Sequence, residues 1–281
     1  MKNHRQPYEE MNPLHPIPTG LSPRGTLPRK VKAILFDIYG TLFISGSGDI
    51  SIAEKESGNT DKLNRLLQRF SIKEPVESVL KRFFSAIVTA HAKLRAEGID
   101  YPEIRIEEIW QTVLGIDNTQ NLIDFSIAYE MCVNPVFPMP HARNSLDTCR
   151  EKSIVMGIIS NAQFFTMDLF IQFFHADPAS LGFDPALLFL SYQHGYAKPS
   201  PYLFQQAVSG LSQKNISPAS VLYIGNDMLN DMVPAENAGF QTALFAGDKR
   251  SLRLRKEDER CKNLHPDIVI TDLSQLLNHI S

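Results

Sequence analysis

The sequence has no long apolar run and no excess of basic residues. Its longest apolar segments, such as residues 154–159, are far shorter than the ~20 residues that a membrane-spanning helix needs. The first 18 residues lack the apolar stretch of a secretory signal. The net charge of −3 indicates no basic surface for nucleic acid or for anionic lipid. We therefore expect no membrane and no nucleic-acid partner.

Paired metal ligands and a disulfide framework are also missing. The three cysteines, Cys132, Cys149 and Cys261, are odd in number and lack the spacing of metal ligands. This usage is typical of a reduced, cytoplasmic protein. None of the eight histidines has a partner four residues away, which argues against a histidine-based zinc site.

Residues 1–30 differ in composition from the rest of the chain. They contain six prolines and few large apolar residues, so they cannot bury enough surface to fold alone. We predict an extended N-terminal arm that lies on the body of the protein or on a second subunit.

Apolar strand-like segments alternate with helical segments in the C-terminal half. The run KAILFDIY comes first, and this alternation favours an α/β fold with a Rossmann-like parallel sheet. We expect this core to comprise residues 31–45 and 137–281. The predicted later strands are 153–160, 186–192, 220–225, 241–246 and 267–271, and the predicted helices are 163–174, 201–211 and 229–239.

A helical block interrupts the core soon after its first strand. Apolar residues recur at helical spacing in four segments, namely 61–70, 76–98, 104–115 and 121–133. Three prolines in residues 134–140 end the series. We predict an inserted helical cap domain over residues 46–136, with a loop or hairpin over residues 43–59. The basic run at residues 249–256 favours a solvated loop or short helix.

Polar residues follow the predicted strands at four places. These are Asp37, the pair Ser160–Asn161, Lys198, and the segment 225–227. In a sheet of this kind, ligands bind beyond the carboxyl ends of the strands. We therefore expect these four places to meet at one site.

The same four segments carry a family resemblance. FDIYGTLF, GIISN, GYAKPSP and IGNDMLND stand in this order, and together they resemble the motifs of the haloacid dehalogenase superfamily. The resemblance covers residues 31–275. It implies a hydrolase with a Rossmann-like core and a helical cap of the C1 type.

The resemblance also implies roles for the motif residues. Asp37 would be the nucleophile, since a carboxylate can form a covalent intermediate that water then cleaves. Ser160, Asn161 and Thr41 would bind the transferring group. Lys198 would neutralise the negative charge that gathers near Asp37.

Asp227 and Asp231 stand four residues apart. By themselves they suit a helix N-cap and an acid in the first helical turn. The resemblance implies that they hold Mg²⁺ together with Asp37 and the backbone carbonyl of Tyr39. Oxygen ligands of this kind suit Mg²⁺, and converging carboxylates need a cation to stay ionised at neutral pH.

Tyr39 leaves the reaction open. In the superfamily's phosphatases an aspartate usually stands here as acid and base, whereas a tyrosine, with a pKa of ~10, is a poor general base. The superfamily's L-2-haloacid dehalogenases have tyrosine here, but they lack the paired acids of the fourth motif. We expect a Mg²⁺-dependent phosphatase that acts through an aspartyl-phosphate on a small phosphorylated metabolite, as a monomer or homodimer. The alternatives are a metal-independent 2-haloacid dehalogenase and a non-catalytic binding protein.

Overall fold

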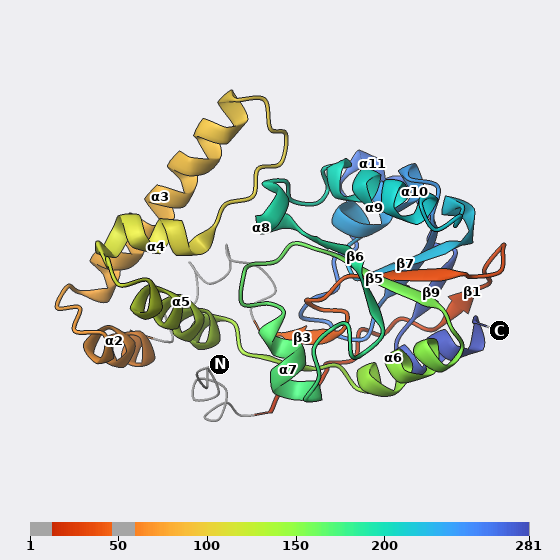
Figure 1. The fold of residues 1–281 in the computed structure, drawn as a ribbon, viewed down its shortest axis with the longest axis horizontal. Coiled ribbons are helices and arrows are strands. Elements are labelled where there is room, and N and C mark those ends of the chain that lie inside the picture. The colour runs from red at the N-terminus through yellow and green to blue at the C-terminus, as the bar shows by residue number, and fades with distance from the viewer. Residues whose placement is uncertain (1–12, 47–59, 281) are drawn as a thin grey trace.

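The computed structural model describes residues 13–46 and 60–280. At its centre lies a seven-stranded sheet in the order β1-β9-β8-β7-β2-β5-β6 (Figure 1). All neighbouring strands are parallel except β1, which runs antiparallel to β9. The strands are β1 (Arg24–Gly25), β2 (Ala33–Phe36), β5 (Val155–Ser160), β6 (Phe183–Leu190), β7 (Val221–Gly225), β8 (Gln241–Phe245) and β9 (Ile268–Ile270). The predicted α/β class is confirmed.

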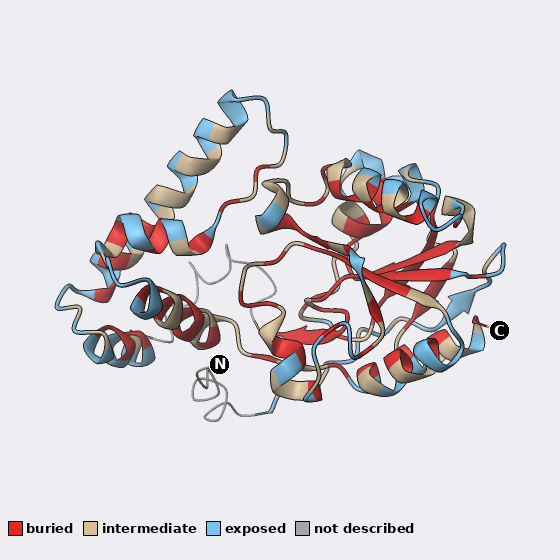
Figure 2. Ribbon diagram, in the orientation of Figure 1, coloured by how far each residue is buried: buried red, intermediate tan, exposed pale blue. Residues whose placement is uncertain are grey.

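The central strands are apolar throughout because helices cover both faces of the sheet. Successive residues of β2 alternate between two hydrophobic clusters, with Ile34 and Phe36 in one and Ala33 and Leu35 in the other. Helices α6 (Ala142–Glu151) and α7 (Asp168–Phe174) contribute to the first cluster. Helices α9 (Tyr202–Ser212) and α10 (Val233–Asn237) contribute to the second. Figure 2 shows the buried strands between these layers.

Four helices lie to one side of the sheet, and we call them the cap helices (Figure 1). They are α2 (Thr60–Arg69), α3 (Val76–Ala96), α4 (Ile106–Leu114) and α5 (Thr119–Val133). Their own core is aromatic. Trp110 stacks on Phe83 with 3.9 Å between ring centroids, and Phe125 and Tyr129 pack around this pair. All four helices begin and end close to the predicted positions, while the domain boundary itself stays a prediction.

A two-stranded antiparallel ribbon joins the cap helices to the core. Strand β3 (Phe43–Ser45) leads out of the core, and β4 (Val136–Pro138) leads back beside it. Short elements complete the fold. They are α8 (Ser191–His194), η2 (Pro218–Ser220), the π-helical turn η3 (Met228–Met232), α11 (Glu259–Lys262) and η4 (Leu273–Asn278).

Two predicted helices are shorter than expected. The helix predicted over residues 163–174 begins only at Asp168. The preceding residues form a turn, in which the N–H of Gln163 donates to Thr166 Oγ1. The helix predicted over residues 229–239 is divided into η3 and α10. Pro234 stands near the start of α10, where its missing N–H costs no helical hydrogen bond.

Residues 13–30 run along the core. Thr19 Oγ1 donates to the carbonyl of Ala246 (2.9 Å), and the N–H of Arg29 donates to Gln241 Oε1 (2.9 Å). The first 12 residues of the predicted arm, and residues 47–59 of the predicted loop, lie outside the described residues.

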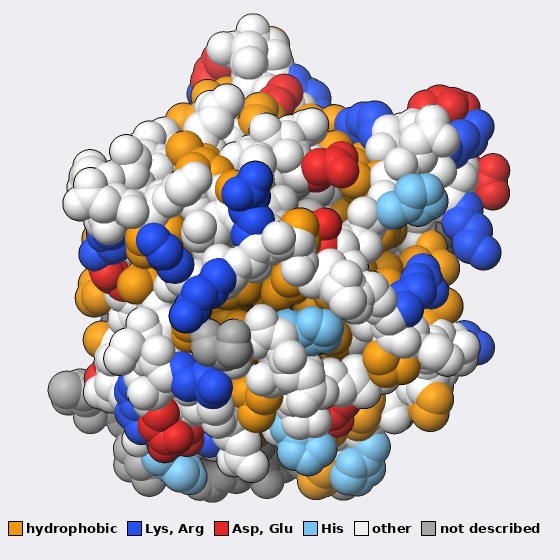
Figure 3. Space-filling view, turned by 90° about the vertical axis from the view of Figure 1, so that its right-hand side faces the viewer, with side chains coloured by type: hydrophobic (Ala, Val, Ile, Leu, Met, Phe, Trp, Pro, Cys, Tyr) orange, Lys and Arg blue, Asp and Glu red, His pale blue; other side chains and the backbone are white. Residues whose placement is uncertain are grey.

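No helix in the described ranges has both the length and the apolar character to cross a bilayer. On the face shown in Figure 3, basic side chains are interspersed with acidic ones and with histidines. The absence of a nucleic-acid partner stays a prediction.

Candidate active site

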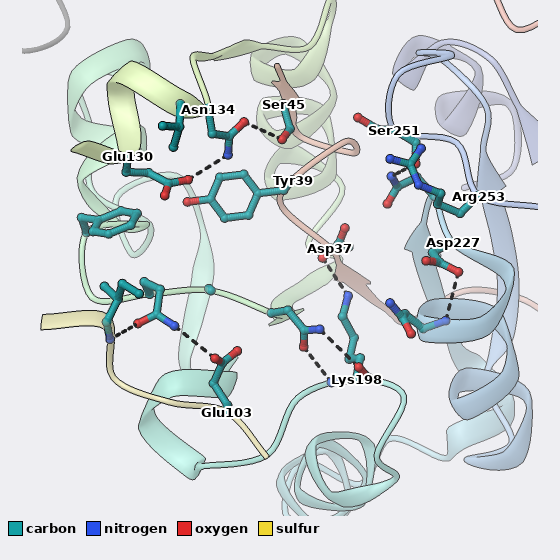
Figure 4. A pocket seen from close by; sticks show the side chains of 18 of the residues that line it. Asp37, Tyr39, Ser45, Glu103, Glu130, Asn134, Lys198, Asp227, Ser251 and Arg253 are labelled. Carbon is teal, nitrogen blue, oxygen red and sulfur yellow. Dashed lines mark hydrogen bonds and ion pairs between the residues drawn. The ribbon is translucent and has the colours of Figure 1, made fainter. Parts of the chain in front are cut away.

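The ends of three neighbouring strands bring the predicted motifs together. Asp37 follows β2, which lies between β5 and β7, and Phe36 pairs in register with Ile158 and Ile224. Ser160 therefore lies on one side of Asp37 and the segment after β7 on the other. A cavity of about 320 Å³ opens between this edge and the cap helices (Figure 4). Its lining includes six predicted site residues, namely Asp37, Tyr39, Asn161, Lys198, Asp227 and Asp231.

Lys198 stands at the centre of the site and is almost fully buried. Its Nζ donates to Asp37 Oδ1 (2.8 Å) and to Asp231 Oδ1 (2.5 Å). Burial opposes the charged form of Lys198, but the two carboxylates outweigh burial and raise its pKa. The backbone of Lys198 is held by Asn161, whose side chain accepts from its N–H (2.7 Å) and donates to its carbonyl (3.3 Å).

Asp37 has one occupied and one open carboxylate oxygen. Its Oδ1 accepts from Lys198 and from Ser160 Oγ (2.9 Å). Within residues 13–46 and 60–280, no hydrogen bond reaches Oδ2, which lies on the cavity side (Figure 4). Ser160 is fully buried and so acts on Asp37 rather than lining the cavity. The carboxylate is thus fixed by one oxygen and free to react through the other.

Asp231 is a structural partner of Lys198. Its Oδ1 also accepts from the Tyr223 hydroxyl (2.9 Å), and its Oδ2 accepts from the N–H groups of Asn226 and Asp227 (2.9 Å each). Burial raises the pKa of Asp231 to about 6, so this carboxyl is mostly ionised at pH 7. Only glycine fits at position 225, because a Cβ there would lie 2.3 Å from Asp231 Cγ.

Asp227 caps the turn that follows β7. Its Oδ1 accepts from the N–H groups of Leu229 (2.9 Å) and Asn230 (3.2 Å). Its Oδ2 pairs with Arg255 Nη2 at 2.7 Å. Asp227 also lines the cavity with Asp37. The interpretation of Asp227 as an N-cap, drawn from the residues alone, is therefore confirmed.

The predicted Mg²⁺ ion would be bound by carboxylates of this site. No group of three or more acidic, histidine or cysteine side chains in the described ranges is arranged to hold a metal. Mg²⁺ is usually bound by one or two carboxylates, water and substrate phosphate. Asp37 and Asp227 both line the cavity and, with the Tyr39 carbonyl, would hold the ion, but both oxygens of Asp227 are engaged as well, so Mg²⁺ would displace Arg255 from Asp227 Oδ2. Asp231, whose oxygens are already engaged, would support them through Lys198.

Tyr39 points away from Asp37 (Figure 4). Its hydroxyl is hydrogen-bonded to Thr166 Oγ1 (3.0 Å), and in Figure 4 its ring extends toward Glu130 of α5. The turn after it needs glycine, because Gly40 has a φ of +83° and a Cβ there would lie 2.3 Å from Asn226 Nδ2. Thr41, a predicted substrate ligand, is fully buried, and its hydroxyl has no partner among the described residues.

Two groups of cavity residues were not predicted from the sequence. The first lies on the cap side. Asn134 Nδ2 donates to Glu130 Oε1 (2.9 Å), and Ser45 Oγ donates to Asn134 Oδ1 (2.8 Å). Glu103 accepts from Ser191 Oγ (2.7 Å) and from Gln163. Burial raises the pKa of both glutamates.

The second group comes from the loop after β8. The prediction of a solvated loop at residues 249–256 is wrong for Ser251, which is 3% exposed, and for Arg253, which lines the cavity. The signal was present in the sequence. These residues follow a predicted strand, and the same strand-end rule that selected Asp37 applies to them.

The chain matches a known protein family over most of its length. The family model of haloacid dehalogenase-like hydrolases matches residues 31–239. The chain belongs to this family of hydrolases. The prediction of a hydrolase is thereby confirmed, and the non-catalytic alternative is not supported. A search of curated proteins finds no match to the chain.

Solved structures of this family share the fold. A 2-haloacid dehalogenase from Pseudomonas syringae pv. Tomato DC3000 matches with a TM-score of 0.56 and 20% identity, over 88% of this chain and 97% of that chain. An L-2-haloacid dehalogenase from Xanthobacter autotrophicus, with chloropropionic acid covalently bound, matches with 0.51 and 19%, over 88% and 97%. A HAD phosphatase from Thermococcus onnurineus matches with 0.50 and 16%, over 89% and 99%. At these identities the comparison shows the fold alone.

The Lys198→Met variant should lose about 3–5 kcal/mol of unfolding free energy at pH 7, because it leaves two buried carboxylates without their cation. Urea denaturation of wild type and variant measures this loss. Lys214→Met is the matched control. It breaks the partly exposed pair with Asp184, which should cost less than about 1 kcal/mol. Equal losses in both variants would contradict the central role of Lys198.

The Glu130→Gln variant should gain stability relative to wild type as the pH rises. The folded-state pKa of Glu130 is raised above 4.5 by burial. Its contribution to stability is therefore complete below the unfolded-state pKa and is lost as the pH rises through the folded-state pKa. Glutamine cannot ionise, so the contribution of residue 130 to the stability of the variant does not fall as the pH rises. Urea denaturation at pH 5 and pH 8 should show the variant improving relative to wild type at the higher pH, and the opposite trend would refute the assignment.

Proposed function

We propose that this protein is a Mg²⁺-dependent phosphohydrolase that acts through an aspartyl-phosphate on a small phosphorylated metabolite. The observation that carries the proposal is that Asp37 and Asp227 both line the cavity, while no hydrogen bond from the described residues reaches Asp37 Oδ2. Asp227 adds a second carboxylate beside the nucleophile. Mg²⁺ in place of Arg255 would give this carboxylate a divalent partner.

The first chemical step is an attack by Asp37 Oδ2 on the phosphorus of the substrate. Ser160 and Lys198 hold Oδ1, so the carboxylate is oriented before the reaction begins. The new P–O bond forms as the bond to the leaving oxygen breaks. When bound by Asp37, Asp227 and the Tyr39 carbonyl, Mg²⁺ would supply positive charge to the phosphoryl oxygens.

Water then releases inorganic phosphate and restores the Asp37 carboxylate. In both steps Lys198 balances negative charge at Asp37. Tyr39 is poorly suited to give or take protons at neutral pH. The favoured substrates are therefore phosphates whose leaving group needs little protonation.

A second candidate is a metal-independent 2-haloacid dehalogenase. It is favoured by Tyr39 and by the internal cations of the site, since Lys198 already serves Asp37 and Asp231, and Arg255 serves Asp227. A halide leaves without a proton. Asp37 would then attack carbon, and water would cleave the ester intermediate.

The proposal predicts phosphate release from p-nitrophenyl phosphate and acetyl phosphate in Mg²⁺, and its loss in EDTA. Asp37→Asn should fall to the uncatalysed background, because an amide cannot form the acyl phosphate. Ser274→Ala, which removes an exposed hydroxyl outside the cavity lining, is the control variant and should keep the wild-type rate. Chloride release from 2-chloropropionate is measured in parallel. Chloride release without metal, and no phosphate release with it, would establish the second candidate instead.

Tyr39→Asp should raise the rate on alkyl phosphates relative to p-nitrophenyl phosphate by about 10²-fold or more, because it adds to the cavity lining a carboxyl group that can act as general acid and base. Tyr39→Phe keeps the ring and removes only the hydroxyl, so it should leave this ratio unchanged. The kcat values for ethyl phosphate and p-nitrophenyl phosphate give the ratio. An unchanged ratio in Tyr39→Asp would show that proton transfer does not limit alkyl substrates.

A further inference from the structure

The loop after β8 is bound to the fourth motif by backbone hydrogen bonds. The N–H of Arg253 donates to the carbonyl of Asn226 (3.0 Å), and the N–H of Met228 donates to the carbonyl of Arg253 (2.8 Å). Arg253 thus continues the strand-like pairing of the core beyond the sheet. Its position relative to the nucleophile is set by the backbone, which makes it suitable for recognition.

Ser251 is packed against the turn of the first motif. Its carbonyl accepts from Asn226 Nδ2 (2.7 Å), and a Cβ on Gly40 would lie only 2.5 Å from the Ser251 Cβ. The residue is 3% exposed and lines the cavity. Its Oγ has no hydrogen-bond partner in the described parts of the chain. A buried hydroxyl without a partner is costly unless a ligand supplies one.

Arg253 has hydrogen-bond donors left over at the cavity. Its Nη1 donates to the carbonyls of Arg250 (2.5 Å) and Leu252 (3.2 Å), which fixes the guanidinium. No carboxylate in the described ranges pairs with it, whereas the neighbouring Arg250 and Arg255 pair with Asp248 and Asp227. Figure 4 shows Arg253 and Ser251 together on the Asp227 side of the cavity.

The sheet order separates this pair from the groups that hold the nucleophile. Ser160 follows β5, on one side of β2, whereas Ser251 and Arg253 follow β8, on the other side. The charges of Lys198 and Arg255 are compensated by carboxylates. Arg253 is a cation with no carboxylate partner among the described residues, and both Arg253 and Ser251 belong to the lining of the cavity that also includes Asp37.

We propose that Arg253 and Ser251 bind a second anionic group of the substrate, a carboxylate or a further phosphate, separate from the phosphoryl group that Asp37 attacks. A guanidinium and a hydroxyl both donate, and oxyanions accept from such donors at short range. The inference rests on the proposed function, because it defines this group relative to the transferred phosphoryl. It narrows the substrate class to phosphate esters that carry a second negative charge.

Binding of phosphonates, which cannot be hydrolysed, tests the inference without turnover. Three ligands are titrated by calorimetry at constant free Mg²⁺, namely propylphosphonate, phosphonoacetate and ethane-1,2-bisphosphonate. In the wild type, at least one of the two ligands with a second anion should bind about tenfold more tightly than propylphosphonate, as one charge-assisted contact provides. The carboxylate and bisphosphonate arms show which anion is preferred.

The measured quantity is the affinity for the preferred dianionic ligand divided by the affinity for propylphosphonate. Arg253→Gln and Ser251→Ala should each reduce this ratio toward one. Arg250→Gln is the matched control, because Arg250 lies in the same loop but outside the cavity lining, and it should keep the wild-type ratio. A wild-type ratio near one overturns the inference, as does an equal loss for all three ligands in Arg253→Gln. If p-nitrophenyl phosphate is not hydrolysed but the ratio persists, the proposed function fails while the anion subsite stands.

Discussion

The site depends on one ammonium group held between two buried carboxylates. Lys198 reaches Asp37 and Asp231 at once, and its removal would leave two buried carboxylates without a cation. The same contact sets the reactivity of Asp37, because it occupies one oxygen and leaves the other open. The second acid is held in turn by two backbone N–H groups at the end of β7. The charge balance of the site therefore depends on the ends of β2 and β7 lying side by side in the sheet.

Glycine makes this arrangement possible at two positions. Gly225 allows the Asp231 carboxylate to lie against the backbone, and Gly40 allows the first motif to approach Asn226 and Ser251. In both places a side chain would collide with the atoms that order the site. The glycine of FDIYGTLF thus serves two purposes, since it turns the chain after Asp37 and makes room for the loop after β8.

Much of this could be predicted from the sequence, and the rest depended on tertiary contacts. Strand-end polar residues and helical spacing gave Asp37, Lys198 and the cap helices, because both signals are local. The N-cap role of Asp227 could be predicted from the sequence, but the ion pair of Asp231 with Lys198 could not, since four-residue spacing is the same for a cap, an ion pair and a metal ligand. Arg253 was missed because a basic run is usually solvated, and only the pairing with Asn226 turns it inward.

The ribbon of β3 and β4 has a consequence for how such a protein can diversify. The chain leaves the core at Ser45 and re-enters at Val136, and these two residues are paired neighbours. An insertion whose ends are adjacent can be exchanged for another of different length without disturbing the strand pairing beneath it. The half of the cavity formed by the insertion can then vary independently of the half that carries the chemistry, so new substrates are open to the fold while its reaction centre is retained.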